Sequence, residues 1–295
     1  MNRAIDARNA AKAAADLIKR RLQIAEGAPP KIGLVLGTGW GGALPWDHAP
    51  MSVPFDRIGP FKLDQLEGHA REVRYGTVGD VPVIALSGRI HLNEASGDPD
   101  IPRMVRLHIQ MLFELGVRTL VVTAAVGGLV QAAATGNVVV IDGVVTAFAP
   151  DLPLFAGEFC SPEDVLDKNL QQIALEALEN TGFAPMSGGH AMVRGPFFEG
   201  RRYDKPLLRQ TGASVVGMSI LPEIAIASLY RHPEKIDLSR TDEAWLVPAR
   251  ALALGFVTNN DTEEHRHETN QERAKAKSEA LGALLKILIP RLAAS

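Results

Sequence analysis

The chain has 295 residues, 46% of them hydrophobic and 22% charged, so it can bury a sizeable core. A formal net charge of -3 leaves no basic footprint for nucleic acid, which directs the search for partners to small molecules and other protein chains. Positions 1–23 carry charged residues throughout, which argues against a secretory signal. No apolar run reaches the roughly 18 residues of a membrane span, so we expect none.

The first half of the chain alternates helical and strand-like patterns. Alanine, leucine and charged residues from Ala4 to Gln23 favour a helix that GAPP ends, so residues 1–28 form the expected N-terminal helical segment. The runs KIGLVLG, EVRYGTV and VPVIALSG predict strands. Apolar residues at helical spacing predict a helix from Pro102 to Gly116, with Gly116 as its stop.

The second half continues the alternation. The runs TLVVTAAVGG, NVVVIDGVV, ASVVGMS and ALALGFVTNN predict strands. Helical patterns cover Pro162 to Asn180, Arg201 to Thr211, PEIAIASLYR and about Glu268 to Ile289. Residues 232–250 are polar without clear periodicity, which indicates an inserted surface loop.

Strands that alternate with helices indicate an α/β fold. Because the sequence has no repeat and no long linker, we expect one domain over residues 1–295. Its single cysteine, Cys160, excludes an internal disulfide and fits a reducing compartment, so we expect a cytoplasmic protein. We interpret Cys160 as a small buried apolar residue rather than a reactive thiol.

The stretch VLGTGWGG runs from a strand into a glycine turn, and Gly37, Gly39 and Gly42 fit the G-x-G-x-x-G pattern of dinucleotide-binding loops. A dinucleotide fold needs a helix directly after the loop and an acidic residue about 20 positions on, where Asp56 stands. Pro45, however, follows too soon to sit inside such a helix. An NAD-dependent oxidoreductase is therefore the disfavoured interpretation.

The same loop suits a single inorganic phosphate better. Thr38 supplies a hydroxyl between two glycines, and backbone N–H groups in such a turn can form an anion-binding concavity. A plain turn with an incidental threonine is the alternative. GRIH places Arg89 and His91 two positions apart at the end of a strand, so both can point to one anion. EGHAR adds His69 beside a glycine; each histidine taken alone also fits a surface or structural role.

Seven motifs occur together and in order: GTG, GHA, GRIH, TAAVGGL, GPFFE, VGMSILPE and TNN. In this the chain resembles the purine nucleoside phosphorylases of the trimeric class, which also includes the methylthioadenosine phosphorylases. The resemblance extends from the glycine loop to the C-terminal helix. It implies a fold with a mixed central β-sheet flanked by helices. It also implies that the protein is a homotrimer. It also implies phosphorolysis of purine ribo- or deoxyribonucleosides to free base and (deoxy)ribose 1-phosphate, with inorganic phosphate as co-substrate and neither a metal nor an organic cofactor.

The resemblance also implies a role for each matching residue. The implied phosphate site consists of Thr38, His69, Arg89, His91, the backbone N–H of Ala125, and Ser219. The implied nucleoside site consists of Asn93, Phe198, Glu199, Val216, Met218, Asn259 and His267, with Met218 against the ribose and His267 on the 5′-hydroxyl. The implied catalytic residues are His91, Glu199 and Asn259.

In the roles that the resemblance implies, Glu199 and Asn259 contact the base, and the base preference rests largely on Asn259. Glu199 can accept hydrogen bonds from N1–H and the 2-amino group of guanine. Asn259 can bond the 6-oxo and N7 edge, where negative charge develops as the glycosidic bond breaks. Family members that favour 6-aminopurines carry aspartate in this part of the site. We therefore expect 6-oxopurine nucleosides, guanosine and inosine.

The sequence departs from the family at several positions. Asn93 stands where the family usually has a tyrosine that touches the ribose, and Ala124 replaces a common asparagine. The segment APDLPLFAGEFCSPED does not match the family's loop that caps the pocket of a neighbouring subunit. Phe155 or Phe159 can supply that cap, although an ordinary buried aromatic is the other interpretation.

These departures keep two further functions open. A methylthioadenosine phosphorylase would need a small apolar pocket at the 5′ position, where His267 offers a polar partner. A non-catalytic purine or phosphate binder would fit Asn93 and the divergent loop, whereas Arg89, His91, Glu199 and Asn259 argue against it.

Overall fold

A computed structural model of the chain describes residues 2–59, 70–94, 97–155, 157–195, 197–260 and 276–295. In this part of the chain the strands are β1 Ile32–Leu36, β2 Met51–Pro54, β3 Glu72–Val78, β4 Val81–Ser87, β5 Thr119–Gly128, β6 Val138–Val145, β7 Ser187–Met192, β8 Ala213–Gly217 and β9 Arg250–Asn259. The α-helices are α1 Asn2–Arg21, α2 Asp100–Leu115, α3 Lys168–Glu179, α4 Asp204–Gln210, α5 Leu221–Leu229, α6 Pro233–Ile236, α7 Glu243–Leu246 and α9 Ser278–Ala293. Short 3₁₀ turns cover Phe55–Arg57 and Pro162–Val165.

All these strands belong to one sheet in the order β2-β3-β4-β1-β5-β8-β7-β6-β9, and β9 also pairs with β5. The pairings of β1 with β4 and β5, of β5 with β9, and of β7 with β6 and β8 are parallel. The others are antiparallel. The predicted mixed sheet is thus confirmed, and the β5–β9 pairing closes its last five strands into a ring.

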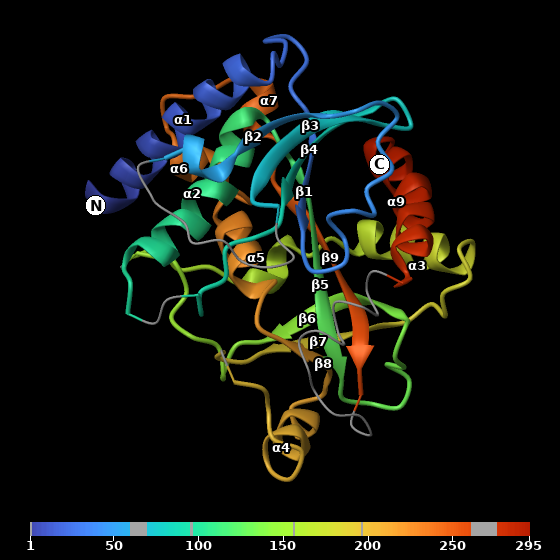
Figure 1. Ribbon diagram of the computed structural model, residues 1–295. Helices are drawn as coiled ribbons and strands as arrows, with labels where there is room; N and C mark the ends of the chain where they lie inside the picture. The colour runs from blue at the N-terminus through green and yellow to red at the C-terminus, as the bar shows by residue number, and fades with distance from the viewer. Residues whose placement is uncertain (1, 60–69, 95–96, 156, 196, 261–275) are drawn as a thin grey trace.

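Helices cover both faces of the sheet, as Figure 1 shows. Helices α1, α2 and α5 share one hydrophobic core with one face, and α3 and α9 share another core with the opposite face. Strand β1 is buried along its whole length because it lies between two parallel neighbours and two helical layers. None of the described helices has the length and apolarity to cross a membrane.

Several predicted boundaries differ from the structure. Helix α1 ends at Arg21, inside the predicted 1–28 segment. The pattern from Pro162 begins as a 3₁₀ turn, and α3 starts only at Lys168 because Asp167 caps it by accepting hydrogen bonds from two backbone N–H groups. Helix α4 starts at Asp204 rather than Arg201. The C-terminal helix continues past Ile289 to Ala293, and residues 268–275 of its predicted extent lie outside the described residues.

Strand β7 was not predicted. Its sequence, SGGHAM, contains two glycines and a histidine, which are poor local signals for a strand. It forms because β6 and β8 supply parallel partners on both sides.

The segment 232–250, predicted as a surface loop, holds α6, α7 and a fully buried Trp245. The Trp245 indole donates a hydrogen bond to the carbonyl of Pro233 (3.2 Å). Its ring contacts the guanidinium groups of Arg8, Arg118 and Arg240. The segment is therefore packed onto the body of the protein by one aromatic side chain.

Candidate active site

The glycine loop is hydrogen-bonded to the middle of β5. The backbone N–H of Gly37 donates to Thr123 Oγ1 (3.1 Å), and the indole N–H of the fully buried Trp40 donates to the carbonyl of Ala124 (3.3 Å). Residues 38–43 form turns, and no helix opens from them in the described stretch up to Pro54. The structure thus lacks the helix N-terminus that a dinucleotide pyrophosphate requires, in agreement with the prediction from Pro45. Thr38 lies half-buried in this loop.

Arg89 joins the glycine loop to helix α5. Its guanidinium Nη1 lies 2.7 Å from Glu223 Oε1, and Nη2 donates to the carbonyl of Thr123. Arg89 and Glu223 are each only 3% exposed. A Cβ atom built on Gly37 would come within 3.0 Å of Arg89 Nη2, so the loop that carries Thr38 passes directly beside this cation. Glu223 was not predicted as a site residue, although it is the acidic residue of the motif VGMSILPE.

His91 is oriented by a carboxylate that the sequence analysis also missed. Its backbone N–H donates to Glu94 Oε1 (2.8 Å), and its ring Nδ1 lies 3.5 Å from the same oxygen. The guanidinium of Arg71 holds the other oxygen of Glu94 at 2.6 Å. Burial alone would raise the pKa of Glu94, but the hydrogen bonds from His91 and the charge of Arg71 lower it. Glu94 therefore stays ionised and holds His91 in place.

Ser219 and Ala125 lie where β8 and β5 end near each other. Ser219 is buried and follows β8, and the Ala125 carbonyl lies 3.7 Å from the position of a Cβ atom built on Gly217. Between Ser219 and α5, Ile220 has a φ of 77°, a conformation rarely adopted by a β-branched residue. Such strained backbone gathers at functional sites.

Three residues predicted for the purine converge on Gly127 of β5. A Cβ atom built on this glycine would lie 3.3 Å from Val216 Cγ1, 3.4 Å from Asn259 Nδ2 and 3.6 Å from Glu199 Oε1. The amide of Asn259, the carboxylate of Glu199 and the apolar side chain of Val216 thus surround one point. They come from β9, from the segment after β7 and from β8. Asn259 is 3% exposed, and its Oδ1 accepts a hydrogen bond from Thr258 Oγ1 (3.1 Å).

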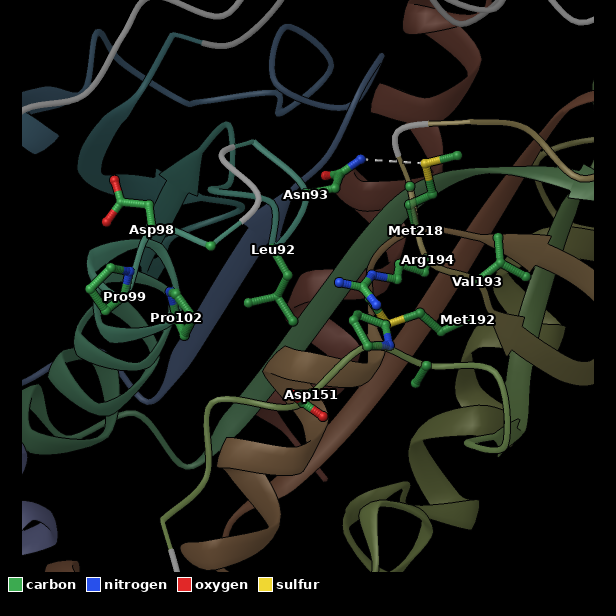
Figure 2. A pocket seen from close by; sticks show the side chains of 14 residues that line it. Leu92, Asn93, Asp98, Pro99, Pro102, Asp151, Met192, Val193, Arg194 and Met218 are labelled. Atoms are coloured by element: carbon green, nitrogen blue, oxygen red, sulfur yellow. Dashed lines mark hydrogen bonds between the residues drawn. The ribbon is translucent and has the colours of Figure 1, made fainter.

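A cavity of about 350 Å³ lies beside Met218, the residue that follows β8 (Figure 2). It is lined by both residues predicted to touch the ribose, Asn93 and Met218, whose Nδ2 and Sδ atoms lie 3.5 Å apart. Arg194, Asp98 and Asp151, which the sequence analysis did not select, also line it. The cavity therefore has a polar lining beside the predicted ribose contacts.

Residues 31–290 match the family model of the phosphorylase superfamily. Purine nucleoside phosphorylase 1 of Bacillus subtilis is 30% identical over 205 residues, which cover 68% of this chain and 74% of the relative. The chain belongs to the purine nucleoside phosphorylase family. The purine nucleoside phosphorylase of Rattus norvegicus is 27% identical over 278 residues, 88% of each chain. Isoform 2 of the Schistosoma mansoni enzyme, solved with cytosine and ribose-1-phosphate, superposes with a TM-score of 0.77 at 26% identity over 96% of both chains.

Two predicted site residues of this phosphorylase, His69 and His267, lie outside the described residues. Phe198, predicted for the purine, is 42% exposed beside Glu199. Of the candidate capping residues, Phe159 is 96% exposed, whereas Phe155 is half-buried with the guanidinium of Arg106 4.3 Å from its ring centroid. Cys160 is half-buried, in contrast to the predicted buried position. No group of three or more His, Cys, Asp or Glu suited to a metal occurs among the described residues.

Proposed function

We propose that this purine nucleoside phosphorylase acts on 6-oxopurine nucleosides, guanosine and inosine, and their deoxyribose forms. Phosphate attacks the anomeric carbon, the glycosidic C–N bond breaks, and the bonding electron pair leaves with the base. The products are the free purine and (deoxy)ribose 1-phosphate. The observation that carries this proposal is the convergence of Glu199, Asn259 and Val216 around Gly127.

In this proposal the phosphate is held by Arg89 together with the hydroxyls of Thr38 and Ser219, His91, His69 and the Ala125 N–H. The support is chemical: guanidinium, imidazole, hydroxyl and amide groups all donate hydrogen bonds to an anion, each contributing on the order of 1–3 kcal/mol. The buried contacts of Arg89 with Glu223 and Thr123 fix its guanidinium in advance. Such preorganisation lowers the cost of binding and of charge development in the transition state.

The base is held by Glu199 and Asn259, with Val216 and Phe198 supplying apolar surface. An ionised carboxylate is an acceptor only, which suits the N1–H and 2-amino donors of guanine. The Asn259 amide can donate to the 6-oxo and N7 edge as the leaving purine gains charge. Asn93 and Met218 lie against the ribose, and His267 bonds the 5′-hydroxyl.

The experiment measures base release from inosine, guanosine, adenosine and methylthioadenosine, each with and without phosphate. We expect phosphate-dependent release from inosine and guanosine. Release only from the two adenine nucleosides would overturn the role given to Asn259. Tight binding without release from any of them would favour the non-catalytic binder instead.

We further propose a homotrimer in the cytoplasm that needs neither a metal nor an organic cofactor. An apolar groove of about 920 Å³ between α1, α2 and residues 152–155 supports association, because monomers rarely expose large apolar patches. The single cysteine supports a reducing compartment. Light scattering during gel filtration tests the trimer: the mass should be three times the 31.7 kDa of one chain. Full activity after dialysis against a chelator tests the absence of a metal.

A further inference from the structure

A lysine is buried behind the carboxylate proposed to read the purine. Lys205 Nζ lies 3.9 Å from Glu199 Oε1, and the exposed fractions of the two side chains are 0% and 6%. A tight turn sets this spacing, because the Lys205 backbone N–H donates to the carbonyl of Gly200 (3.1 Å) and the Gly200 N–H donates to Asp204 Oδ2 (2.8 Å). Lys205 therefore reaches Glu199 from inside the protein.

Burying an ammonium group is costly, so a fully buried lysine needs a compensating partner. Burial lowers the pKa of Lys205, as do Arg201 and Arg209, whereas Glu199 raises it. Burial raises the pKa of Glu199, and Asp204 raises it further, whereas its own backbone N–H and Lys205 lower it. Among the described residues, Lys205 is thus the charged side chain that opposes protonation of Glu199.

We propose that Lys205 is the specificity-determining positioning residue of the purine site: it keeps Glu199 ionised and so selects bases that carry a hydrogen at N1. This inference rests on the proposed function. A 6-oxopurine presents an N1–H donor, which an ionised carboxylate accepts. A 6-aminopurine presents a bare N1 acceptor, which repels a carboxylate but accepts a hydrogen bond from a protonated carboxyl group. The charge on Glu199 therefore decides between the two classes of base.

The test replaces Lys205 by methionine, which keeps the side-chain length and removes the charge. The kcat/KM values for inosine and adenosine are measured from about pH 5.5 to 8.5. Without the lysine, Glu199 is neutral over a wider pH range. We expect the acid limb of the inosine profile to move to higher pH, and the adenosine-to-inosine ratio near pH 6 to rise at least about tenfold. The ratio should fall back as the pH rises. Lys205→Arg should keep the wild-type profile.

A second variant on the same turn gives the opposite sign. Asp204 is exposed, and an asparagine there keeps an oxygen for the Gly200 N–H. At low ionic strength Asp204→Asn should move the acid limb of the inosine profile to lower pH, because a carboxylate that raises the pKa of Glu199 is removed. This variant decides the question if Lys205→Met does not fold.

Failure of the inference and failure of the proposed function look different. The role of Lys205 alone is overturned if the wild-type enzyme releases base from inosine but the acid limb of the pH profile does not move. This holds for folded Lys205→Met and for Asp204→Asn. Wild-type enzyme that releases no base from inosine in the presence of phosphate overturns the proposed function, and the inference with it.

Discussion

Arg89 and Glu223, which are 134 residues apart in the sequence, form a buried ion pair at the centre of the proposed phosphate site. The 2.7 Å contact joins the loop after β4 to the first turn of α5. Nearly complete burial weakens solvent screening, so each charge depends on the other. The pair therefore links the stability of the fold to the proposed chemistry.

Removing the arginine should expose that link. In Arg89→Met the Glu223 carboxylate stays buried without its cation, so we expect the free energy of unfolding to fall by about 3–5 kcal/mol. The double variant Arg89→Met with Glu223→Gln should recover most of this loss, because no buried charge is left alone. Neither variant should show phosphate-dependent base release. Urea unfolding followed by circular dichroism measures the stabilities; a double variant no more stable than the single one would contradict the argument.

Two glycines of the glycine loop should respond differently to replacement by alanine. A Cβ at Gly37 would lie 2.6 Å from the Thr123 carbonyl and 3.0 Å from Arg89 Nη2, so the backbone must shift and the phosphate KM should rise at least about tenfold. A Cβ at Gly42 meets nothing within 4 Å, so Gly42→Ala is the matched control with wild-type kinetics. Equal phosphate KM values for the two variants would contradict the assignment of the glycine loop to the phosphate site.

The amide of Asn259 should set the base preference. Asn259→Asp replaces a donor at the purine edge by an acceptor, which suits a 6-amino group. We expect the kcat/KM ratio of adenosine to inosine to rise at least about tenfold, equivalent to about 1.4 kcal/mol. Asn260→Asp, one residue further along the chain, is the comparison. An unchanged ratio in Asn259→Asp would contradict the role of Asn259 in base preference.

Acid should destabilise the fold through a buried histidine. Burial and the nearby Arg71 charge lower the pKa of His108 from its ordinary 6.5 to about 4. Between these values the unfolded chain binds a proton that the folded chain does not, so stability falls as the pH falls. In His108→Phe, which keeps a ring against Phe55, the decline from about pH 6.5 to 4 should be shallower. The decline is measured as the denaturant midpoint at several pH values across this range. Parallel curves for the wild type and His108→Phe would refute the prediction.

Trp245 should carry most of the stability of segment 232–250. Its side chain is fully buried, with 0% exposed, so Trp245→Ala should lower the free energy of unfolding by about 3–5 kcal/mol. The neighbouring Leu246 is 39% exposed, and Leu246→Ala should change it by no more than about 1 kcal/mol. Thermal and urea unfolding measure the stability of both variants. Similar losses of stability in Trp245→Ala and Leu246→Ala would mean that the indole does not hold the segment.

Local patterns identified most of the sheet. Runs such as IGLVL and TLVVTAAVGG combine β-branched residues with continuous apolarity, and both became buried strands. Gly116 was predicted as a helix stop and has a φ of 116°, which glycine adopts without strain. The patterns failed at SGGHAM and at residues 232–250, where a strand and two short helices depend on contacts with distant segments.

The sequence by itself determined the α/β class, the family and the set of candidate residues, because strand and helix periodicity and ordered motifs are local properties of the chain. Only the tertiary structure decided how those residues pair. Glu223 with Arg89, Glu94 with His91, and Lys205 with Glu199 are contacts in which burial and charge act together. The charge state of a buried group depends on what surrounds it in space, and β5, β8, β9 and the loops between them bring those surroundings together only when the sheet is complete.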